Sequence, residues 1–305
     1  MEYILKTKEL VKSYGKHIAL NNLVMNVPKG SIYGFIGKNG AGKTTLIRLI
    51  CGLQSITSGE FSLYGVSSKS KDKIANARKK IGAVVEAPAI YLDMSAEDNL
   101  KQQYSLLGIS SYAGMSELLK IVGLQDTGKK KAKNFSLGMR QRLGIAIALV
   151  GSPDFLILDE PINGLDPQGI IEMRELILKL NQEHHITILI SSHILDELSR
   201  VATHFGFIDN GKIVEEISAT DLDRKCRKCF RLTVSDINVL TTTLSAKGCE
   251  YSVVSDKEVE IYDKLDITNL VLELAKKDCK VENMQEKDES LEDYYLQLIG
   301  GSINV

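Results

Sequence analysis

Residues 37–45, GKNGAGKTT, combine glycines, a lysine and hydroxyl side chains that can hold a chain of phosphates. They match G-x-x-x-x-G-K-[ST] at every fixed position and lie between an apolar run and a helical pattern. Glycines let backbone N–H groups point at phosphates, and the N-terminus of the following helix adds positive potential. We therefore expect this phosphate loop to bind ATP with Mg²⁺. Its members are Gly37, Lys38, Asn39, Gly40, Ala41, Gly42, Lys43, Thr44 and Thr45.

Within the phosphate loop, Lys43 and Thr44 have the most specific expected roles. The Lys43 ammonium is expected to reach the β- and γ-phosphates, and the Thr44 hydroxyl is expected to bind Mg²⁺. Two acidic residues, Asp159 and Glu160, end the apolar run FLIL further along the chain. Asp159 suits the Mg²⁺ shell of such an ATPase, and Glu160 would polarise the attacking water. On their own the two acids could form a solvated turn, but Lys43 upstream favours the catalytic interpretation.

His193 follows a second apolar run, ITILIS. A lone histidine after a strand is usually structural. Here, however, the carboxyl ends of neighbouring parallel strands open on the same edge of a sheet, where ligands bind. His193 is therefore expected to reach the γ-phosphate and to hold the attacking water together with Glu160.

The strands and helices that must position these residues are expected to form an α/β fold. Apolar runs without alternation predict strands of a parallel core sheet covered on both faces. Two N-terminal strands are expected around the turn YGKH, and most of residues 95–150 are expected to form a helical subdomain. Asn210-Gly211 predicts the turn of a hairpin. The expected strands are 2–11, 22–27, 31–36, 81–88, 155–158, 186–191 and the hairpin 205–216, and the expected helices include 43–52, 168–182 and 194–202.

The composition changes near residue 218, where the chain becomes polar and charged. We divide it into an ATP-binding domain (1–217), a linker (218–228) and a C-terminal accessory domain (229–305). The accessory domain reads strand, helix, strand, strand, helix, strand, which fits a small α+β fold of the ferredoxin-like type. This domain could be a regulatory ligand-binding module or a packing and dimer-support domain.

Composition narrows the class of protein. The 305 residues include 38 Lys and Arg and 39 Asp and Glu, so no basic excess indicates nucleic acid. The five cysteines are irregularly spaced, which suits a reducing cytosol. The most apolar run, residues 145–150, is far shorter than the roughly 20 residues of a membrane span. We therefore expect a chain that does not itself cross a bilayer.

Taken in order over about residues 3–217, the motifs resemble those of an ATP-binding subunit of an ABC transporter. The resemblance implies that Tyr14 stacks on adenine and that His193 is the switch histidine. Glu86 stands where the family usually has a glutamine that contacts Mg²⁺ and senses the membrane partner. FLILDEP supplies the metal aspartate and the catalytic glutamate.

The segment FSLGM (135–139) stands where the family signature reads LSGGQ, and it keeps Ser136 and Gly138. The resemblance implies that these two residues contact the γ-phosphate held by another subunit, and that Asp166 of NGLDP also crosses to it. ATP would then lie between two chains in a head-to-tail homodimer or heterodimer. The alternative role of Ser136 is simple capping of the helix that follows.

The resemblance also implies a separate transmembrane permease, contacted through about residues 87–104, and a cytoplasmic position on the inner face of the cell membrane. Glu86, SLGMRQRLG and the ending LEDYYLQLIGG resemble the bacterial branch for export of, or immunity to, bacitracin and lantibiotic peptides. The alternative is a soluble ABC-type ATPase that remodels a ribosome or an assembly complex. The tandem branch of that class carries two such domains, whereas one phosphate loop is found here.

Overall fold

The computed structural model describes residues 2–226, 229–263, 266–287 and 291–300. The chain divides into two compact units, residues 1–219 and 220–305, each with its own hydrophobic core. Part of the segment 218–228, interpreted above as a linker, forms the short helix α8 (Ala219–Lys225). Residues 227–228 of that segment and the last five residues of the accessory domain lie outside the described residues.

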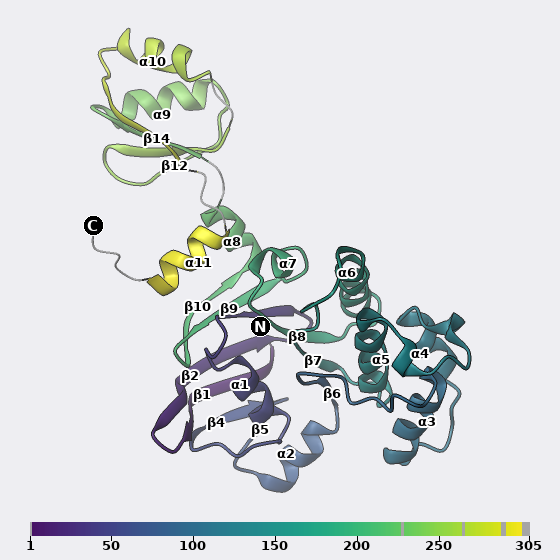
Figure 1. The fold of residues 1–305 in the computed structure, drawn as a ribbon. Coiled ribbons are helices and arrows are strands. Elements are labelled where there is room, and N and C mark those ends of the chain that lie inside the picture. The colour runs from purple at the N-terminus through teal and green to yellow at the C-terminus, as the bar shows by residue number, and fades with distance from the viewer. Residues whose placement is uncertain (1, 227–228, 264–265, 288–290, 301–305) are drawn as a thin grey trace. The chain divides into compact units, whose positions relative to one another are not determined.

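The first unit is built on a six-stranded sheet with the strand order β10-β9-β3-β8-β7-β6 (Figure 1). The strands from β9 to β6 run parallel, and β10 pairs antiparallel with β9. Every residue of β3, β7 and β8 is buried, as expected for strands covered on both faces. The predicted parallel core sheet is confirmed. The strands are β3 (Ile32–Ile36), β6 (Ile81–Val84), β7 (Phe155–Asp159), β8 (Thr187–Ser192), β9 (His204–Asp209) and β10 (Lys212–Ser218).

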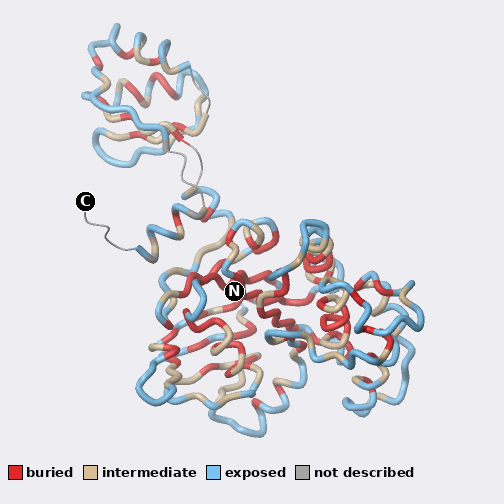
Figure 2. Tube along the Cα trace, in the orientation of Figure 1, coloured by how far each residue is buried: buried red, intermediate tan, exposed pale blue. Residues whose placement is uncertain are grey.

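A second, antiparallel sheet carries the N-terminal strands in the order β2-β1-β4-β5. Its apolar side chains share one buried cluster with α1 (Lys43–Ile50) and with one face of the core sheet. Figure 2 shows this buried layer inside a surface of exposed loops and helix faces. The predicted antiparallel N-terminal strands are confirmed. They are β1 (Tyr3–Tyr14), β2 (His17–Pro28), β4 (Ser58–Leu63) and β5 (Val66–Ser67).

The predicted helical subdomain consists of α3 (Ala96–Leu106), α4 (Met115–Ile121) and α5 (Leu137–Leu149). The Ser95 side chain caps α3 by accepting a hydrogen bond from the Asp98 N–H. In the part of the chain that the structure describes, no helix has both the length and the apolar character needed to span a membrane. The remaining helical segments of this unit are α2 (Lys71–Arg78), η1 (Gln125–Thr127), η2 (Ala132–Asn134), α6 (Pro167–Gln182) and α7 (Leu195–Ser199).

The hairpin β9–β10 turns at Asn210-Gly211, as the sequence predicts. Both residues have positive φ, 46° and 76°, which a two-residue turn of this type requires. This turn lies against the first unit's N-terminal hairpin, because the Gly211 carbonyl accepts a hydrogen bond from the Asn21 N–H at 2.9 Å. The turn therefore joins the far edge of the core sheet to the second sheet.

The second unit has four antiparallel strands in the order β12-β13-β11-β14 and two helices, α9 and α10, whose apolar residues share its core. This is the split β-α-β-β-α-β arrangement, so the ferredoxin-like prediction is confirmed. The short helix α11 is tied to α8, because the Lys225 ammonium donates to the Tyr294 hydroxyl at 2.8 Å. The elements are β11 (Cys229–Val234), α9 (Ile237–Ala246), β12 (Tyr251–Val253), β13 (Glu258–Ile261), α10 (Ile267–Ala275), β14 (Val281–Lys287) and α11 (Leu291–Gly300).

Candidate active site

The phosphate loop joins the end of β3 to the start of α1, and its glycines are needed there for two physical reasons. Gly40 and Gly42 have φ values of 83° and 115°, which side chains with a Cβ rarely adopt. A Cβ on Gly37 would lie 2.5 Å from Ile208 Cγ2, and one on Gly42 would lie 2.7 Å from the Ala19 carbonyl oxygen. The loop is therefore packed against β9 and β2 with its backbone free to face a ligand.

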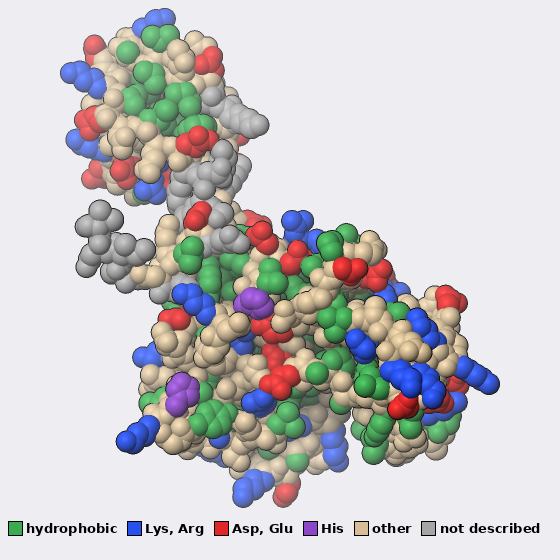
Figure 3. Space-filling model, in the orientation of Figure 1, with side chains coloured by type: hydrophobic (Ala, Val, Ile, Leu, Met, Phe, Trp, Pro, Cys, Tyr) green, Lys and Arg blue, Asp and Glu red, His purple; other side chains and the backbone are tan. Residues whose placement is uncertain are grey.

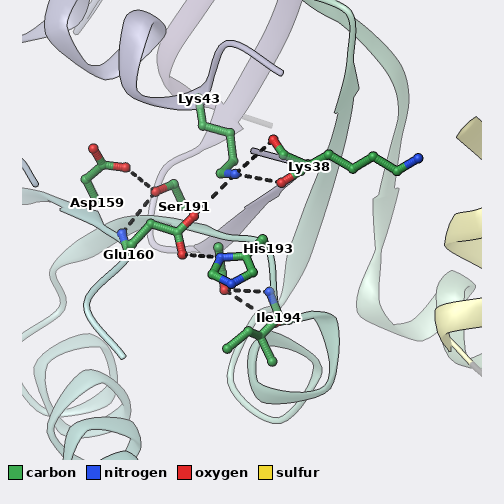
Figure 4. Close-up of polar contacts among 9 residues, drawn as sticks. Lys38, Lys43, Asp159, Glu160, Ser191, His193 and Ile194 are labelled. Carbon is green, nitrogen blue, oxygen red and sulfur yellow. Dashed lines mark hydrogen bonds and ion pairs between the residues drawn. The ribbon is translucent and has the colours of Figure 1, made fainter. Parts of the chain in front are cut away.

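Lys43 is the first residue of α1 and is buried, with 6% of its surface exposed. Its ammonium donates to the Gly37 carbonyl at 2.6 Å and lies 3.2 Å from Glu160 Oε1 (Figure 4). A positive charge is thus held inside the loop, next to the backbone expected to surround phosphates. Lys43 therefore remains the residue that we expect to contact the β- and γ-phosphates.

Glu160 connects the phosphate loop to His193. One carboxylate oxygen pairs with Lys43, and the other lies 2.8 Å from His193 Nδ1. Its backbone has φ of 52°, in the left-handed region, directly after β7 ends. The carboxyl end of β7 thus contributes Glu160, and the loop after β8 contributes His193. The structure brings both predicted catalytic residues to the same edge of the core sheet as the phosphate loop.

Asp159 is almost completely buried, with 2% of its surface exposed. Its Oδ1 accepts a hydrogen bond from Ser191 Oγ, whereas its Oδ2 has no hydrogen-bond partner in the described structure.

Burial raises the pKa of the nearby Cys51 thiol to about 12; Arg78 opposes this shift and Asp159 adds to it. The thiol is therefore neutral.

A buried carboxylate oxygen without a partner is costly, and a bound cation would relieve that cost. Mg²⁺ prefers oxygen ligands and is usually held by one or two protein groups together with substrate phosphates. Asp159 Oδ2 therefore fits the predicted Mg²⁺ site, with the Thr44 hydroxyl as the second protein ligand. When bound there, Mg²⁺ would neutralise negative charge on the phosphates.

Lys43, Thr44 and Glu160 line a cleft of about 330 Å³ in the first unit, a volume within the usual range for ligand sites. The buried Asp159 is not among the residues that line it. Figure 3 shows acidic side chains gathered across the middle of this face of the unit, beside a histidine. The cleft contains most of the predicted nucleotide site and both predicted catalytic residues. It is lined by Tyr14, His17, Ala19, Asn39, Gly40, Gly42, Lys43, Thr44, Thr45, Glu160, Asn163 and His193.

Tyr14 stands at the mouth of this cleft, at the end of β1. Its hydroxyl donates to the Gln54 side chain, and the Lys12 ammonium lies 5.0 Å from the centre of its ring. Tyr14 is 42% exposed. An aromatic surface held in this way is suited to stacking on a base, which is the role predicted for Tyr14.

Glu86 does not line the cleft. Its carboxylate forms an ion pair with Arg48 of α1, and its side chain is 59% exposed. Its φ of 60° is also in the left-handed region. The structure does not bring Glu86 to the lining of the cleft, so the metal contact predicted for it stays a prediction.

Ser136, Gly138 and Asp166 are also absent from the lining of the cleft. Ser136 caps α5 by accepting from the Met139 N–H at 3.2 Å, and Asp166 caps α6 by accepting from the Gly169 N–H at 3.1 Å. Both cap residues are exposed. The three residues lie on neighbouring turns, since a Cβ on Gly138 would meet Leu165 at 3.7 Å.

Four residues near the phosphate loop were not predicted from the sequence. His17, Ala19 and Asn163 line the cleft, and Ser191 contacts Asp159. Ser191 is the last residue of the apolar run ITILIS and lies two residues before His193. The position of Ser191 at the end of an apolar run was the available signal.

Comparison with known proteins identifies the family of this chain. The ABC transporter family profile matches residues 20–163. "Bacitracin transport ATP-binding protein BcrA" of Bacillus licheniformis is 42% identical over 305 residues, covering 99% of each chain. "Lantibiotic transport ATP-binding protein SrtF" of Streptococcus pyogenes is 49% identical over 213 residues, 70% of this chain and 90% of that protein. The chain belongs to the ATP-binding proteins of ABC transporters.

The structures of solved cassettes agree with this assignment. The ATP-binding cassette MJ0796, solved as a dimer in a post-hydrolysis state with ADP and Pi, has a TM-score of 0.62 and 25% identity. The match covers 70% of this chain and 98% of that one. This ABC ATPase subunit hydrolyses ATP with Mg²⁺, and its partners are a second ATP-binding subunit and a separate permease.

Replacing Glu160 by Gln is predicted to leave ATP binding intact and to stabilise an ATP-bound dimer. Steady-state hydrolysis should fall by about two to four orders of magnitude, since the amide cannot accept a proton from water. Phosphate release and fluorescent-nucleotide binding measure the two effects. Glu183→Gln, the same change at the exposed residue that follows α6, should hydrolyse ATP normally. Wild-type turnover in Glu160→Gln would exclude the role assigned to Glu160.

Proposed function

We propose that this ABC ATPase energises the export of, or immunity to, an antimicrobial peptide of the bacitracin or lantibiotic class. The observation that carries the proposal is the 42% identity to the bacitracin transport protein across 99% of both chains, because that alignment includes the second unit. The lantibiotic relative aligns over 213 residues. Bacitracin-like peptides are therefore the first substrates to test.

In the proposed cycle, Lys43 and the loop backbone hold the phosphates, while Thr44 and Asp159 hold Mg²⁺. Glu160 and His193 orient and deprotonate the attacking water, which their 2.8 Å contact and their place in the cleft support. ATP would replace Glu160 as the anionic partner of Lys43. Binding would thereby release the Glu160 carboxylate toward the water.

The other half of each ATP site is proposed to come from a second subunit. Ser136 and Asp166 are exposed, lie outside the cleft and cap the N-termini of α5 and α6. A helix N-terminus attracts phosphate through its unpaired N–H groups and its dipole. In a head-to-tail dimer, the α5 N-terminus with Ser136 and Gly138 would cover the γ-phosphate bound to the partner.

The permease is proposed to dock in a second cleft of about 550 Å³, between β6, the segment after Glu86 and helices α3 and α5. Leu106 and Leu107 on its rim are 72% and 50% exposed, and Tyr91 is 52% exposed. Figure 3 shows hydrophobic side chains together with Lys and Arg over the region of α3 and α4. Apolar exposure on this scale in a pre-formed groove is typical of a protein-binding surface.

The wall of this groove is held in a defined shape. The Asn99 amide accepts from the Tyr91 N–H at 2.7 Å and donates to the Tyr91 carbonyl at 3.0 Å. The Leu92 carbonyl accepts from the Lys133 N–H at 2.8 Å. We propose that the subunit is cytoplasmic and is held through this groove at the inner face of the cell membrane. The ribosome-directed alternative is not favoured, because the similar proteins above are transport proteins.

Leu106→Asp is predicted to prevent co-purification with the partner permease. A charge placed in an apolar docking groove should weaken binding about tenfold or more. ATP hydrolysis by the isolated subunit should not change, since Leu106 lies outside the nucleotide cleft. Val24→Asp, an exposed apolar position on β2, is the matched control and should co-purify normally. Undiminished co-purification of Leu106→Asp would exclude this docking groove.

Expression of the chain with that permease in a sensitive bacterium is predicted to raise the minimum inhibitory concentration of bacitracin. The same strain with Glu160→Gln should be as sensitive as the strain without the transporter, because export would lose its energy source. Growth assays with bacitracin and with several lantibiotics measure the effect. Unchanged sensitivity to all of them, with both proteins present in the membrane fraction, would contradict the proposed substrate class.

A further inference from the structure

Ser191 is a fully buried serine on β8 whose side chain lies between the two acidic residues of the candidate site. Its hydroxyl donates to Asp159 Oδ1 and accepts from the Glu160 N–H at 3.1 Å (Figure 4). Its backbone carbonyl also accepts from the Glu160 N–H at 3.1 Å. Ser191 thus makes three hydrogen bonds to the two residues at the end of β7, Asp159 and Glu160.

The bond to Asp159 controls which carboxylate oxygen is available. A serine hydroxyl has a single hydrogen to donate, and here it goes to Oδ1. Oδ2 is left buried without a partner in the described structure. The terminal torsion of an aspartate is soft, so a carboxylate without this bond could rotate. Ser191 therefore determines which oxygen of Asp159 is left without a protein partner.

The bonds to Glu160 control its backbone. Glu160 has φ of 52°, a conformation that residues other than glycine adopt only when their surroundings hold them. Its N–H is shared between the Ser191 hydroxyl and the Ser191 carbonyl. From this backbone the carboxylate reaches Lys43 and His193. Ser191 therefore also fixes the direction from which Glu160 enters the cleft.

We infer that Ser191 is a positioning residue, which presents Asp159 Oδ2 to the Mg²⁺ that accompanies ATP and holds Glu160 in place. The inference rests on the proposed roles of Asp159 and Glu160. Ser191 does not line the nucleotide cleft, so it acts through these two residues rather than on the substrate. The partner that orients a metal ligand typically contributes about 10–100-fold to metal affinity.

The test measures how strongly Mg²⁺ tightens nucleotide binding. For each variant, the dissociation constant of a fluorescent non-hydrolysable ATP analogue is measured in EDTA and in saturating Mg²⁺. The ratio of the two constants is the coupling between metal and nucleotide. Ser191→Ala should lower this ratio about tenfold, by the size expected for a lost metal-orienting partner, while binding in EDTA stays within about twofold.

Thr187→Val is the matched control. Thr187 lies at the other end of β8, is also buried, and its hydroxyl accepts from the Gly30 N–H at 2.9 Å. The change removes a hydrogen bond of an equally buried side chain on the same strand, away from Asp159, and should leave the ratio unchanged. Ser191→Cys gives a second variant if Ser191→Ala does not fold, since sulfur fills the site but donates weakly. Ser191→Cys should also lower the ratio of the two dissociation constants.

Asp159→Asn separates this inference from the site assignment beneath it. A lowered ratio in Asp159→Asn with a wild-type ratio in the folded Ser191 variants would overturn the role of Ser191 and leave the metal site standing. An unchanged ratio in Asp159→Asn would overturn the metal assignment of Asp159, and the inference with it. Lowered ratios in Asp159→Asn and both Ser191 variants, with Thr187→Val unchanged, would support the inference.

Discussion

The candidate site depends on one carboxylate that holds two other groups in place. Glu160 pairs with the Lys43 ammonium at 3.2 Å through one oxygen and lies 2.8 Å from His193 through the other. These three residues come from segments far apart in the chain, which the parallel register of β3, β8 and β7 brings to one sheet edge. In that register Ser191 is paired with both Phe35 and Asp159. A slip by one residue would turn Asp159 to the other face of the sheet.

The sequence predicted those features whose cause is local. Glycine spacing, apolar runs and Asn210-Gly211 each depend on a few neighbouring residues, so the phosphate loop, the buried strands and the hairpin could be expected. The ferredoxin-like unit followed from its order of elements. Ser191 could not be predicted in the same way, because its role arises from the pairing of two strands that are separated by a helix. Nor could the Glu86–Arg48 ion pair, since long exposed side chains find their partners only in the folded chain.

The ATP site of a single chain lacks some of the residues that the sequence predicts for it. The cleft gathers the residues proposed to bind phosphate and to orient water, yet its lining does not include Ser136, Gly138 or Asp166. In the structure, Ser136 and Asp166 cap their own helices, which a folded monomer needs in any case. The exposed N-termini of α5 and α6 can still bind an anion through their other N–H groups and the helix dipole. The central claim is therefore that each ATP site is completed by a second chain.

The most direct test mixes two variants that should be inactive alone. Lys43→Ala removes the ammonium expected to bind phosphate, and Ser136→Arg fills the surface proposed to cover the partner's γ-phosphate. Each variant by itself should hydrolyse ATP at background level, whereas a mixed dimer contains one intact composite site. The account predicts that mixing the two proteins restores hydrolysis. Hydrolysis by Ser136→Arg alone at the wild-type rate would contradict it, because a single chain would then hold a complete site.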